Sequence, residues 1–162
     1  RTWGRALLSR RPLREPRTHM PERILDARIE HEGRALRVLG AHPMRPGRAA
    51  LTKRRNTVLE RLGTLAGEEP GVVVLGDLNV TEGSPFFRDL LAAGALSDTR
   101  AGRGRMGAWR VSLARYGIDL PWMRLPLDHV LAGRSLATAD RRLGPDIGSD
   151  HLPVVADLGW CD

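Results

Sequence analysis

The stretch VVVLGDLN, residues 72 to 79, combines a strand pattern with polar side chains at its end. Val72 to Leu75 is a short apolar run rich in β-branched residues, which is typical of a strand buried inside a sheet. Asp77 and Asn79 follow two residues apart, so in extended backbone their side chains project from the same face. A carboxylate and an amide in this position can hold a hydrated cation and a phosphate oxygen together. The stretch therefore predicts a buried strand that carries a polar site at its C-terminal end.

Two later segments and one isolated histidine also place polar side chains at the ends of expected strands. Asp128 lies in the segment PLDHVL, Asp150 and His151 lie in GSDHLPVV, and His42 follows a strand that ends at Gly40. Taken one at a time, an aspartate in such a segment also fits a turn residue, and His42 also fits a hydrogen-bonded structural histidine. Taken together, histidines and carboxylates at strand ends supply a metal ligand, a general base and a cation for phosphate.

Hydrophobic periodicity elsewhere in the chain predicts a mixture of strands and helices, which favours an α/β or α+β fold. The expected strands are 24–30, 35–40, 72–75, 127–131 and 152–158, and the expected helices are 48–66 and 85–94. Ser84 is the expected N-cap of the second helix. The Gly- and Arg-rich stretch 101–126 has weak periodicity, and we expect it to be a long surface excursion.

The composition is that of an ordinary globular domain and excludes several classes of protein. The 162 residues are 41% hydrophobic and 28% charged, which excludes a disordered tail and a coiled coil. No run of about 18 apolar residues occurs, so these residues contain no membrane span. The single cysteine, Cys161, excludes an internal disulfide framework and a Cys-rich zinc site.

The positive net charge does not by itself identify a partner. The 26 basic and 19 acidic residues give a net charge of +7, which attracts phosphates and anionic lipid headgroups. Every basic residue except Lys53 is arginine, however, and this skew also fits the composition of a GC-rich genome. Aromatic residues are only 4% of the chain and do not interleave with the arginine clusters as stacking platforms for bases would.

Six short segments, in the same order along the chain, resemble the signatures of the endonuclease/exonuclease/phosphatase superfamily, which has the deoxyribonuclease I-like fold. They are GRALLSR (4–10), GAHP (40–43), GDLN (76–79), GAW (107–109), LDHV (127–130) and GSDHLP (148–153). The first resembles the family's strand that ends in Ser-Arg, and in GAW an alanine, Ala108, replaces the usual hydroxyl residue. The resemblance implies a four-layer α/β/β/α sandwich, with residues 1–162 forming a single domain.

The chain departs from the family pattern at its start. The family places an Asn on its first strand and a metal-binding Glu on its second strand, both before the segment that matches GRALLSR, and neither is found in this sequence. The chain also begins without a methionine. We therefore expect it to be the C-terminal two-thirds of a longer domain that lacks its first strands here.

The resemblance implies hydrolysis of a phosphate mono- or diester by in-line attack of water, assisted by Mg²⁺ or Mn²⁺. Asp77 would orient or deprotonate the water, and Asn79 would hold that water or a phosphate oxygen. His151 would contact the phosphate and would be oriented by Asp128. His42 would bind another non-bridging oxygen or protonate the leaving group. The sequence leaves open whether Asp77 or His151 is the general base.

Three further residues complete the expected site and its surroundings. Asp150 is the best remaining candidate for a metal ligand in the absence of the family's Glu. Trp109 is expected either to line the substrate cleft or to anchor its loop by packing. His129 follows Asp128 directly, so strand alternation points it to the opposite face, and we interpret it as structural.

Several alternatives remain open on sequence grounds. Within the phosphoesterase hypothesis, a nuclease that binds nucleic acid competes with a phosphatase acting on lipid or small-molecule phosphates. A different class is a non-catalytic binding module that retains the fold without a complete metal site. The His-Pro and Gly-x-Trp variants look most like bacterial members of the family, some of which lie behind membrane helices. A bacterial monomer, in the cytoplasm or attached to the membrane through upstream sequence, is therefore expected.

Overall fold

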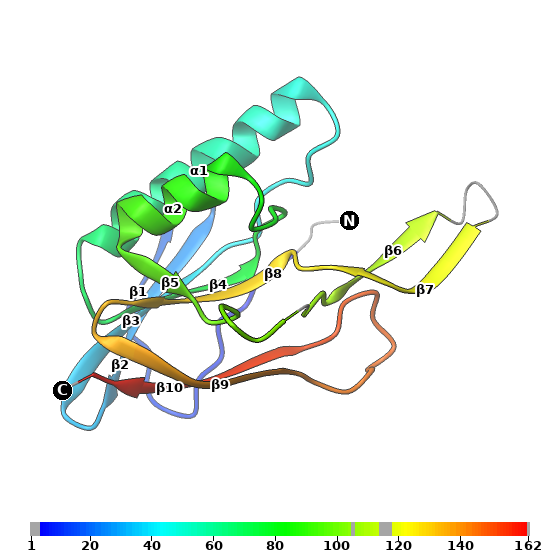
Figure 1. Ribbon diagram of the computed structural model, residues 1–162. Coiled ribbons are helices and arrows are strands. Elements are labelled where there is room, and N and C mark those ends of the chain that lie inside the picture. The colour runs from blue at the N-terminus through cyan, green and yellow to red at the C-terminus, as the bar shows by residue number, and fades with distance from the viewer. Residues whose placement is uncertain (1–3, 105, 114–117, 162) are drawn as a thin grey trace.

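The computed structural model describes residues 4–104, 106–113 and 118–161 (Figure 1). The described elements are, in chain order, β1 (Arg14–His19), β2 (Ile24–His31), β3 (Arg34–Gly40), α1 (Ala49–Gly67), β4 (Val72–Asp77), α2 (Pro85–Gly94), β5 (Leu96–Asp98), β6 (Trp109–Leu113), β7 (Ile118–Leu125), β8 (Asp128–Gly133), β9 (Leu136–Leu143) and β10 (Val154–Trp160). None of the described helices is long and apolar enough to cross a membrane.

A six-stranded sheet with the order β1-β2-β3-β4-β8-β5 forms the centre of the molecule. The β2–β3 hairpin is antiparallel, whereas β3 and β4 are parallel and are connected through α1. β8 then pairs antiparallel with β4. The apolar run Val72–Val74 is buried in the middle of this sheet, as its sequence predicts. The C-terminal end of β4 therefore lies beside the start of β8.

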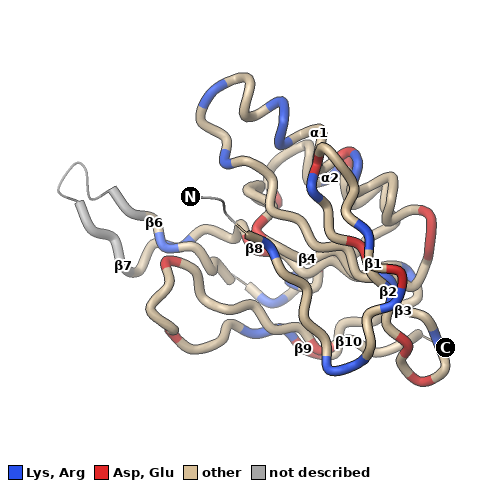
Figure 2. The backbone as a smooth tube through the Cα atoms, turned by 180° about the vertical axis from the view of Figure 1, so that it is seen from behind, with Lys and Arg blue, Asp and Glu red and all other residues tan. Residues whose placement is uncertain are grey.

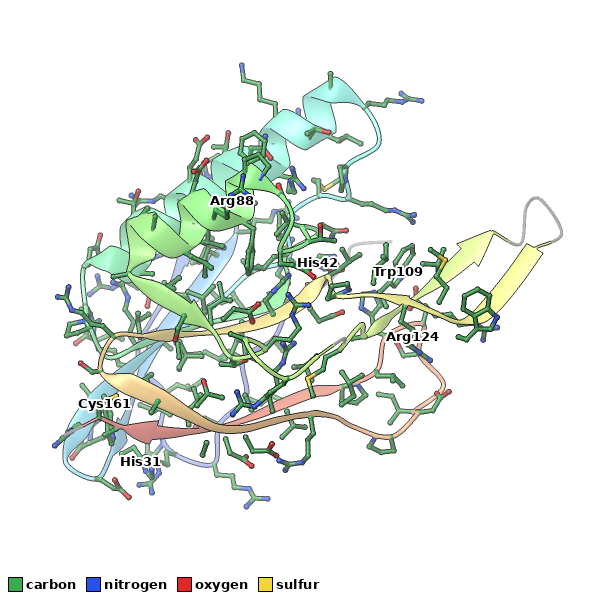
Figure 3. The ribbon with its side chains drawn as sticks, viewed as in Figure 1. His31, His42, Arg88, Trp109, Arg124 and Cys161 are labelled. Atoms are coloured by element: carbon green, nitrogen blue, oxygen red, sulfur yellow. The ribbon has the colours of Figure 1, made fainter. Side chains whose placement is uncertain are left out.

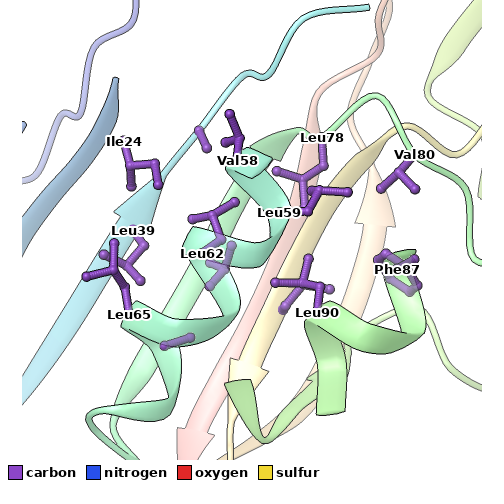
Figure 4. Close-up of a cluster of buried hydrophobic side chains, with 14 of the residues drawn as sticks. Ile24, Leu39, Val58, Leu59, Leu62, Leu65, Leu78, Val80, Phe87 and Leu90 are labelled. Atoms are coloured by element: carbon purple, nitrogen blue, oxygen red, sulfur yellow. The ribbon is translucent and has the colours of Figure 1, made fainter. Parts of the chain in front are cut away.

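Both described helices cover the same face of the central sheet (Figure 1). Leu59, Leu62 and Leu65 of α1 pack with Leu39 of β3 and with Leu90 of α2 in one core cluster (Figure 4). Each fully buried leucine contributes about 1.5–3 kcal/mol relative to exposure. α2 begins after Ser84 as expected, although the Ser84 side chain makes no cap hydrogen bond. The sequence thus predicted the residue at which the helix begins, but the hydrogen bond expected from its side chain is not formed.

The opposite face of the central sheet is covered by the two-stranded β9–β10 sheet. Val73 and Ala132 of the central sheet form a second core cluster with Leu136, and Leu158 and Trp160 pack against this cluster. The layers are therefore helices, central sheet and β9–β10 sheet (Figure 1). These are three of the four layers expected for an α/β/β/α sandwich. In the described part of the chain, no helix covers the outer side of β9–β10.

Two local expectations were wrong. The stretch 101–126 is not a plain excursion, because β6 and β7 pair antiparallel within it and form a hairpin that extends away from the body (Figure 1). Residues 105 and 114–117 of this stretch lie outside the described residues. The segment 4–10 is not a strand, since its described backbone has no ladder partner.

Candidate active site

The site begins with two carboxylates that face each other across neighbouring strands. Asp77 at the end of β4 pairs in register with Asp128 at the start of β8. Like charges directly opposite each other normally destabilise an antiparallel pair. Burial raises the pKa of the Asp128 carboxyl, His151 opposes this shift, and the charge of Asp77 adds to it. Such a pair persists only where other groups hold it, and perturbed carboxylates of this kind cluster at functional sites.

His151 lies between the two carboxylates. Its Nδ1 is 2.8 Å from Asp128 Oδ2, and its Nε2 is 3.9 Å from Asp77 Oδ2. A carboxylate at Nδ1 fixes the hydrogen on that nitrogen and sets the orientation of the ring. Nε2 is therefore the nitrogen that faces Asp77.

His42 approaches Asp77 from the end of the neighbouring strand β3. Its Nε2 lies 3.4 Å from Asp77 Oδ2. Gly76 makes this approach feasible, because it adopts a φ of +137° and a Cβ there would collide with the carbonyl oxygen of Ala41. The Arg5 guanidinium donates a hydrogen bond to the carbonyl oxygen of His42. Figure 3 shows His42 at this end of the central sheet.

Asn79 holds Asp77 in place. Its backbone N–H donates to Asp77 Oδ1 at 3.0 Å, and its side-chain Nδ2 donates to Asp77 Oδ2 at 3.3 Å and to the carbonyl oxygen of Pro43 at 3.1 Å. The residue is 6% exposed and has a φ of +50°, a left-handed conformation that asparagine tolerates. Because its amide N–H groups are engaged within the protein, Asn79 acts here on Asp77, and contact with substrate stays a prediction.

Trp109 and Asp150 form a rim beside His151. Trp109 Nε1 donates to Asp150 Oδ2 at 3.2 Å, and the Trp109 and His151 ring centroids are 6.4 Å apart. Backbone hydrogen bonds connect the same two segments, from Leu152 N–H to the oxygen of Ala108 and from Arg110 N–H to the oxygen of Asp150. The start of β6 therefore lies against the GSDH segment, and Figure 3 shows Trp109 at the base of the hairpin. The side-chain hydrogen bond agrees with Trp109 as a loop anchor.

Few carboxylate oxygens at the site are free to bind a divalent cation. Asp150 is exposed and its Oδ2 already accepts the Trp109 N–H, while both oxygens of Asp77 accept from Asn79. Among the residues that the structure describes, no group of three or more His, Cys, Asp or Glu side chains is arranged to hold a metal ion. A hard cation such as Mg²⁺ is usually bound through one or two carboxylates together with waters and substrate. The described residues therefore do not form a complete metal site.

Two arginines that the sequence did not indicate donate hydrogen bonds to the backbone of site residues. Arg55 of α1 donates to the backbone oxygen of Asn79 at 2.9 Å, and Arg141 of β9, with a fully buried side chain, donates to the backbone oxygen of Asp128 at 3.0 Å. Arg55 lies three residues before the buried Val58 on α1, and a basic residue on that apolar stripe is a signal that could have revealed it. Arg141 offers no comparable signal, because β9 is mostly polar.

His129 lies apart from this cluster. It is 1% exposed, its Nε2 is 2.8 Å from the oxygen of Val80, and its ring centroid is 4.6 Å from that of Phe87. Burial lowers the pKa of His129, which keeps the ring uncharged at neutral pH. Its surroundings agree with the structural interpretation from strand alternation.

The sequence matches the model of the Endonuclease/Exonuclease/phosphatase family over residues 1–151. The chain belongs to this family. A search of curated protein sequences gave no significant match. The expected superfamily and its deoxyribonuclease I-like fold are thus confirmed.

Solved structures of this family have the same fold. Staphylococcus aureus beta toxin is 21% identical with a TM-score of 0.62, and the alignment covers 92% of this chain and 65% of the toxin. A family protein from Beutenbergia cavernae is 24% identical with a TM-score of 0.62, covering 85% and 39% of the two chains. One from Leptotrichia buccalis is 19% identical with a TM-score of 0.60, covering 85% and 54%. The chain thus spans less than two thirds of these proteins. A beta toxin variant was solved with bound magnesium ions.

Proposed function

We propose that this chain carries the hydrolytic centre of a divalent-metal-dependent phosphoesterase, which cleaves a phosphate mono- or diester by in-line attack of water. The proposal is carried by one cluster, in which Asp77 faces the Nε2 atoms of His42 and His151 at 3.4 and 3.9 Å and Asp128 orients His151. Members of this family are in general phosphodiester hydrolases. A carboxylate between two histidines is suited to this reaction, since it combines a base with two phosphate-binding groups.

In this mechanism Asp77 accepts the proton of the attacking water through Oδ2. The two N–H groups of Asn79 fix the carboxylate, so its position does not depend on substrate. His151 and His42 donate from Nε2 to non-bridging phosphoryl oxygens, where negative charge develops. Asp128 stabilises the charged His151 ring that this role requires.

A divalent cation is part of the proposal because the family depends on one. When bound, Mg²⁺ or Mn²⁺ would neutralise charge on the phosphoryl oxygens. Asp150 is the residue of this chain proposed to contribute to its binding, since its carboxylate is exposed beside His151.

The test is hydrolysis of bis(p-nitrophenyl) phosphate in the presence of Mg²⁺ by the wild type and by Asp77→Asn. One positioned proton-transfer group contributes about 10²–10⁴-fold, so a loss of at least about 10²-fold in kcat is expected. Asp89→Asn, an exposed carboxylate on α2, is the matched control and should retain full activity. Circular dichroism shows whether each variant folds. Activity of Asp77→Asn within tenfold of the wild type would contradict the assignment.

A second candidate function is a non-catalytic binding module. It is favoured by one observation, the absence of a three-ligand metal cluster among residues 4–104, 106–113 and 118–161. Titration with Mg²⁺ separates the two functions. A measurable Mg²⁺ site supports the enzyme, whereas no binding at millimolar Mg²⁺ together with no hydrolysis supports the module.

A further inference from the structure

A pocket of about 600 Å³ lies beside His42, on the side away from the β9–β10 sheet's core cluster. Four segments of the chain line it, and three of them contribute arginines. The coil before β1 contributes Arg5, the turn between β1 and β2 contributes Glu22 and Arg23, and α1 contributes Arg54. His42 lines the same pocket and also faces Asp77, so the pocket adjoins the candidate active site.

The charged side chains that line this pocket are mostly basic. It contains the guanidinium groups of Arg5, Arg23 and Arg54 against the single carboxylate of Glu22. Within the described part of the chain, Arg23 and Arg54 make no ion pair with a carboxylate. Figure 2 shows further basic positions along the segment that leads from β3 into α1, at the same edge of the molecule. The charged lining therefore has more positive than negative groups.

Arg5 adds an independent observation, a buried polar atom without a hydrogen-bond partner in the described part of the chain. Its terminal nitrogen donates to the His42 oxygen, but its Nε is buried and has no hydrogen-bond partner. Burial and the nearby charge of Arg23 both lower the pKa of Arg5. An anion bound beside both arginines would stabilise their charged forms.

We propose that the pocket formed by Arg5, Arg23 and Arg54 binds a second phosphate group of the substrate. This inference rests on the proposed function, because His42 would then contact the phosphate that is hydrolysed while the arginines hold its neighbour. Guanidinium groups bind phosphate oxygens in bidentate geometry and are suited to such a subsite. The substrate class is therefore a phosphate ester that carries another phosphate nearby, as in a 5′-phosphorylated nucleotide ester.

Binding is tested without catalysis, by calorimetric titration of the metal-free chain with inorganic pyrophosphate. The double variant Arg23→Gln/Arg54→Gln should bind at least about tenfold more weakly than the wild type, since charged hydrogen bonds are the strong ones in such sites. Arg61→Gln, an exposed arginine of the same helix that does not line the pocket, should bind as the wild type. Affinity should fall with added salt. Equal affinity of the double variant and the wild type would overturn the proposal.

Kinetics test the subsite with two substrates that differ by one phosphate, thymidine 3′-(p-nitrophenyl phosphate) with and without a 5′-phosphate. In the wild type the 5′-phosphate should lower KM about tenfold. In Arg23→Gln/Arg54→Gln this advantage should disappear, whereas Arg61→Gln, which does not alter the pocket lining, should retain it. An equal KM for the two substrates in the wild type would overturn the proposal.

The two experiments separate failure of this inference from failure of the proposed function. If neither ester is hydrolysed in the presence of Mg²⁺, the phosphoesterase proposal fails, and the pyrophosphate titration alone judges the pocket. Weaker binding by the double variant then supports a phosphate site, and unchanged binding overturns it. Hydrolysis of both esters with equal KM leaves the phosphoesterase intact and removes the subsite.

Discussion

Asp128 is the residue at which stability and the proposed function oppose each other. Its carboxyl faces Asp77 across the β4–β8 ladder, and burial raises its pKa above the ordinary value. A carboxyl with a raised pKa in the folded state costs stability once the pH exceeds the unfolded pKa of about 3.9. Its hydrogen bond to His151 Nδ1 supplies the functional reason to retain it. Natural proteins accept such a loss of stability at active sites.

Asp128→Asn is therefore expected to lower activity without loss of stability. An amide can present its N–H₂ to Nδ1 and reverse the tautomer of His151, so kcat for bis(p-nitrophenyl) phosphate should fall about 10²-fold or more. The unfolding midpoint in urea at pH 7 should equal or exceed that of the wild type, and the difference should vanish below about pH 4. A variant that keeps full activity, or that is clearly less stable at pH 7, would contradict this account.

At the scale of elements, the site depends on how closely β3 passes β4. Ala41 N–H donates to the oxygen of Leu75 at 3.1 Å just before His42, and Gly76 adopts a φ that L side chains rarely allow. A side chain at Gly76 would collide with the Ala41 carbonyl oxygen. The glycine of the GDLN segment is thus required by the backbone, and it brings the His42 loop to Asp77.

Gly76→Ala should lower the free energy of unfolding by at least about 2 kcal/mol, because strained backbone and steric collision add. Gly47→Ala is the matched control, since a Cβ at Gly47 meets no atom within 4 Å. Urea unfolding followed by circular dichroism measures both variants. A change below about 0.5 kcal/mol for Gly76→Ala, the size of an ordinary surface substitution, would show that β3 and β4 can separate without penalty.

A buried ion-pair network connects β1, β2, β3 and the end of α1. Arg37, which is 4% exposed, donates to both oxygens of Asp26 at 3.1 and 2.7 Å and to Glu68 at 2.7 Å, and His19 contacts the same aspartate at 2.9 Å. Burial alone would raise the pKa of Asp26, but the hydrogen bonds from Arg37 and His19 outweigh it and the pKa is lowered. A lowered pKa stabilises the fold above the unfolded pKa of about 3.9, and this stabilisation is lost as the pH falls below it.

Asp26→Asn should cost about 3 kcal/mol at pH 7, because it leaves the buried Arg37 without its main partner. The cost should shrink as the pH falls below about 4, because the wild type then loses the stabilisation that ionised Asp26 provides. Asp140→Asn, which breaks an exposed pair with Arg142, should change the stability by under about 1 kcal/mol. Urea unfolding of the three proteins at pH 7 and pH 3 measures the effect. A pH-independent cost would mean that the network is not electrostatic.

The elements that the sequence predicted are those with strong local signals. Strands 24–30, 35–40 and 72–75 and both helices carry clear apolar patterns, and the structure places them within one or two residues. The strands β1, β5 and β9 were missed, since β1 is exposed on nearly every residue, β5 is only three residues long and β9 is mostly polar. The β6–β7 hairpin is set by pairing across its length and by contact with the GSDH segment, which no local pattern encodes.

The residues of the candidate site also divide into those with a local sequence signal and those placed only by the fold. The residues proposed to carry the chemistry, such as Asp77, His42 and His151, lie in short motifs and could be read from the sequence. The residues that hold them in place could not be read from it. Arg141, for example, lies on β9 in another sheet and donates a hydrogen bond to the backbone oxygen of Asp128, a contact that only the fold creates. The arginines of the pocket likewise come from three segments that only the fold brings together.

At the scale of the whole molecule, the site exists only when the fold is complete. Its groups come from the ends of β3, β4 and β8 and from the segment before β10, so every layer described must be in place to assemble it. A cation bound by few protein carboxylates contributes little to this assembly, because weak binding stabilises the native state only slightly. Activity and stability should therefore respond differently to metal.

Removal of divalent metal should abolish hydrolysis but leave the fold intact. In EDTA the rate on bis(p-nitrophenyl) phosphate should fall at least about 10²-fold and return with Mg²⁺ or Mn²⁺, since the cation supplies charge stabilisation that no residue replaces. The urea midpoint should hardly change, because a weak ligand at a few times its Kd adds about 1 kcal/mol or less. Asp150→Asn should raise the Mg²⁺ concentration for half-maximal rate about tenfold, whereas Asp146→Asn, an exposed neighbour, should not. Undiminished hydrolysis in EDTA would remove the metal from the mechanism and leave the carboxylate and histidine cluster as the whole of the catalyst.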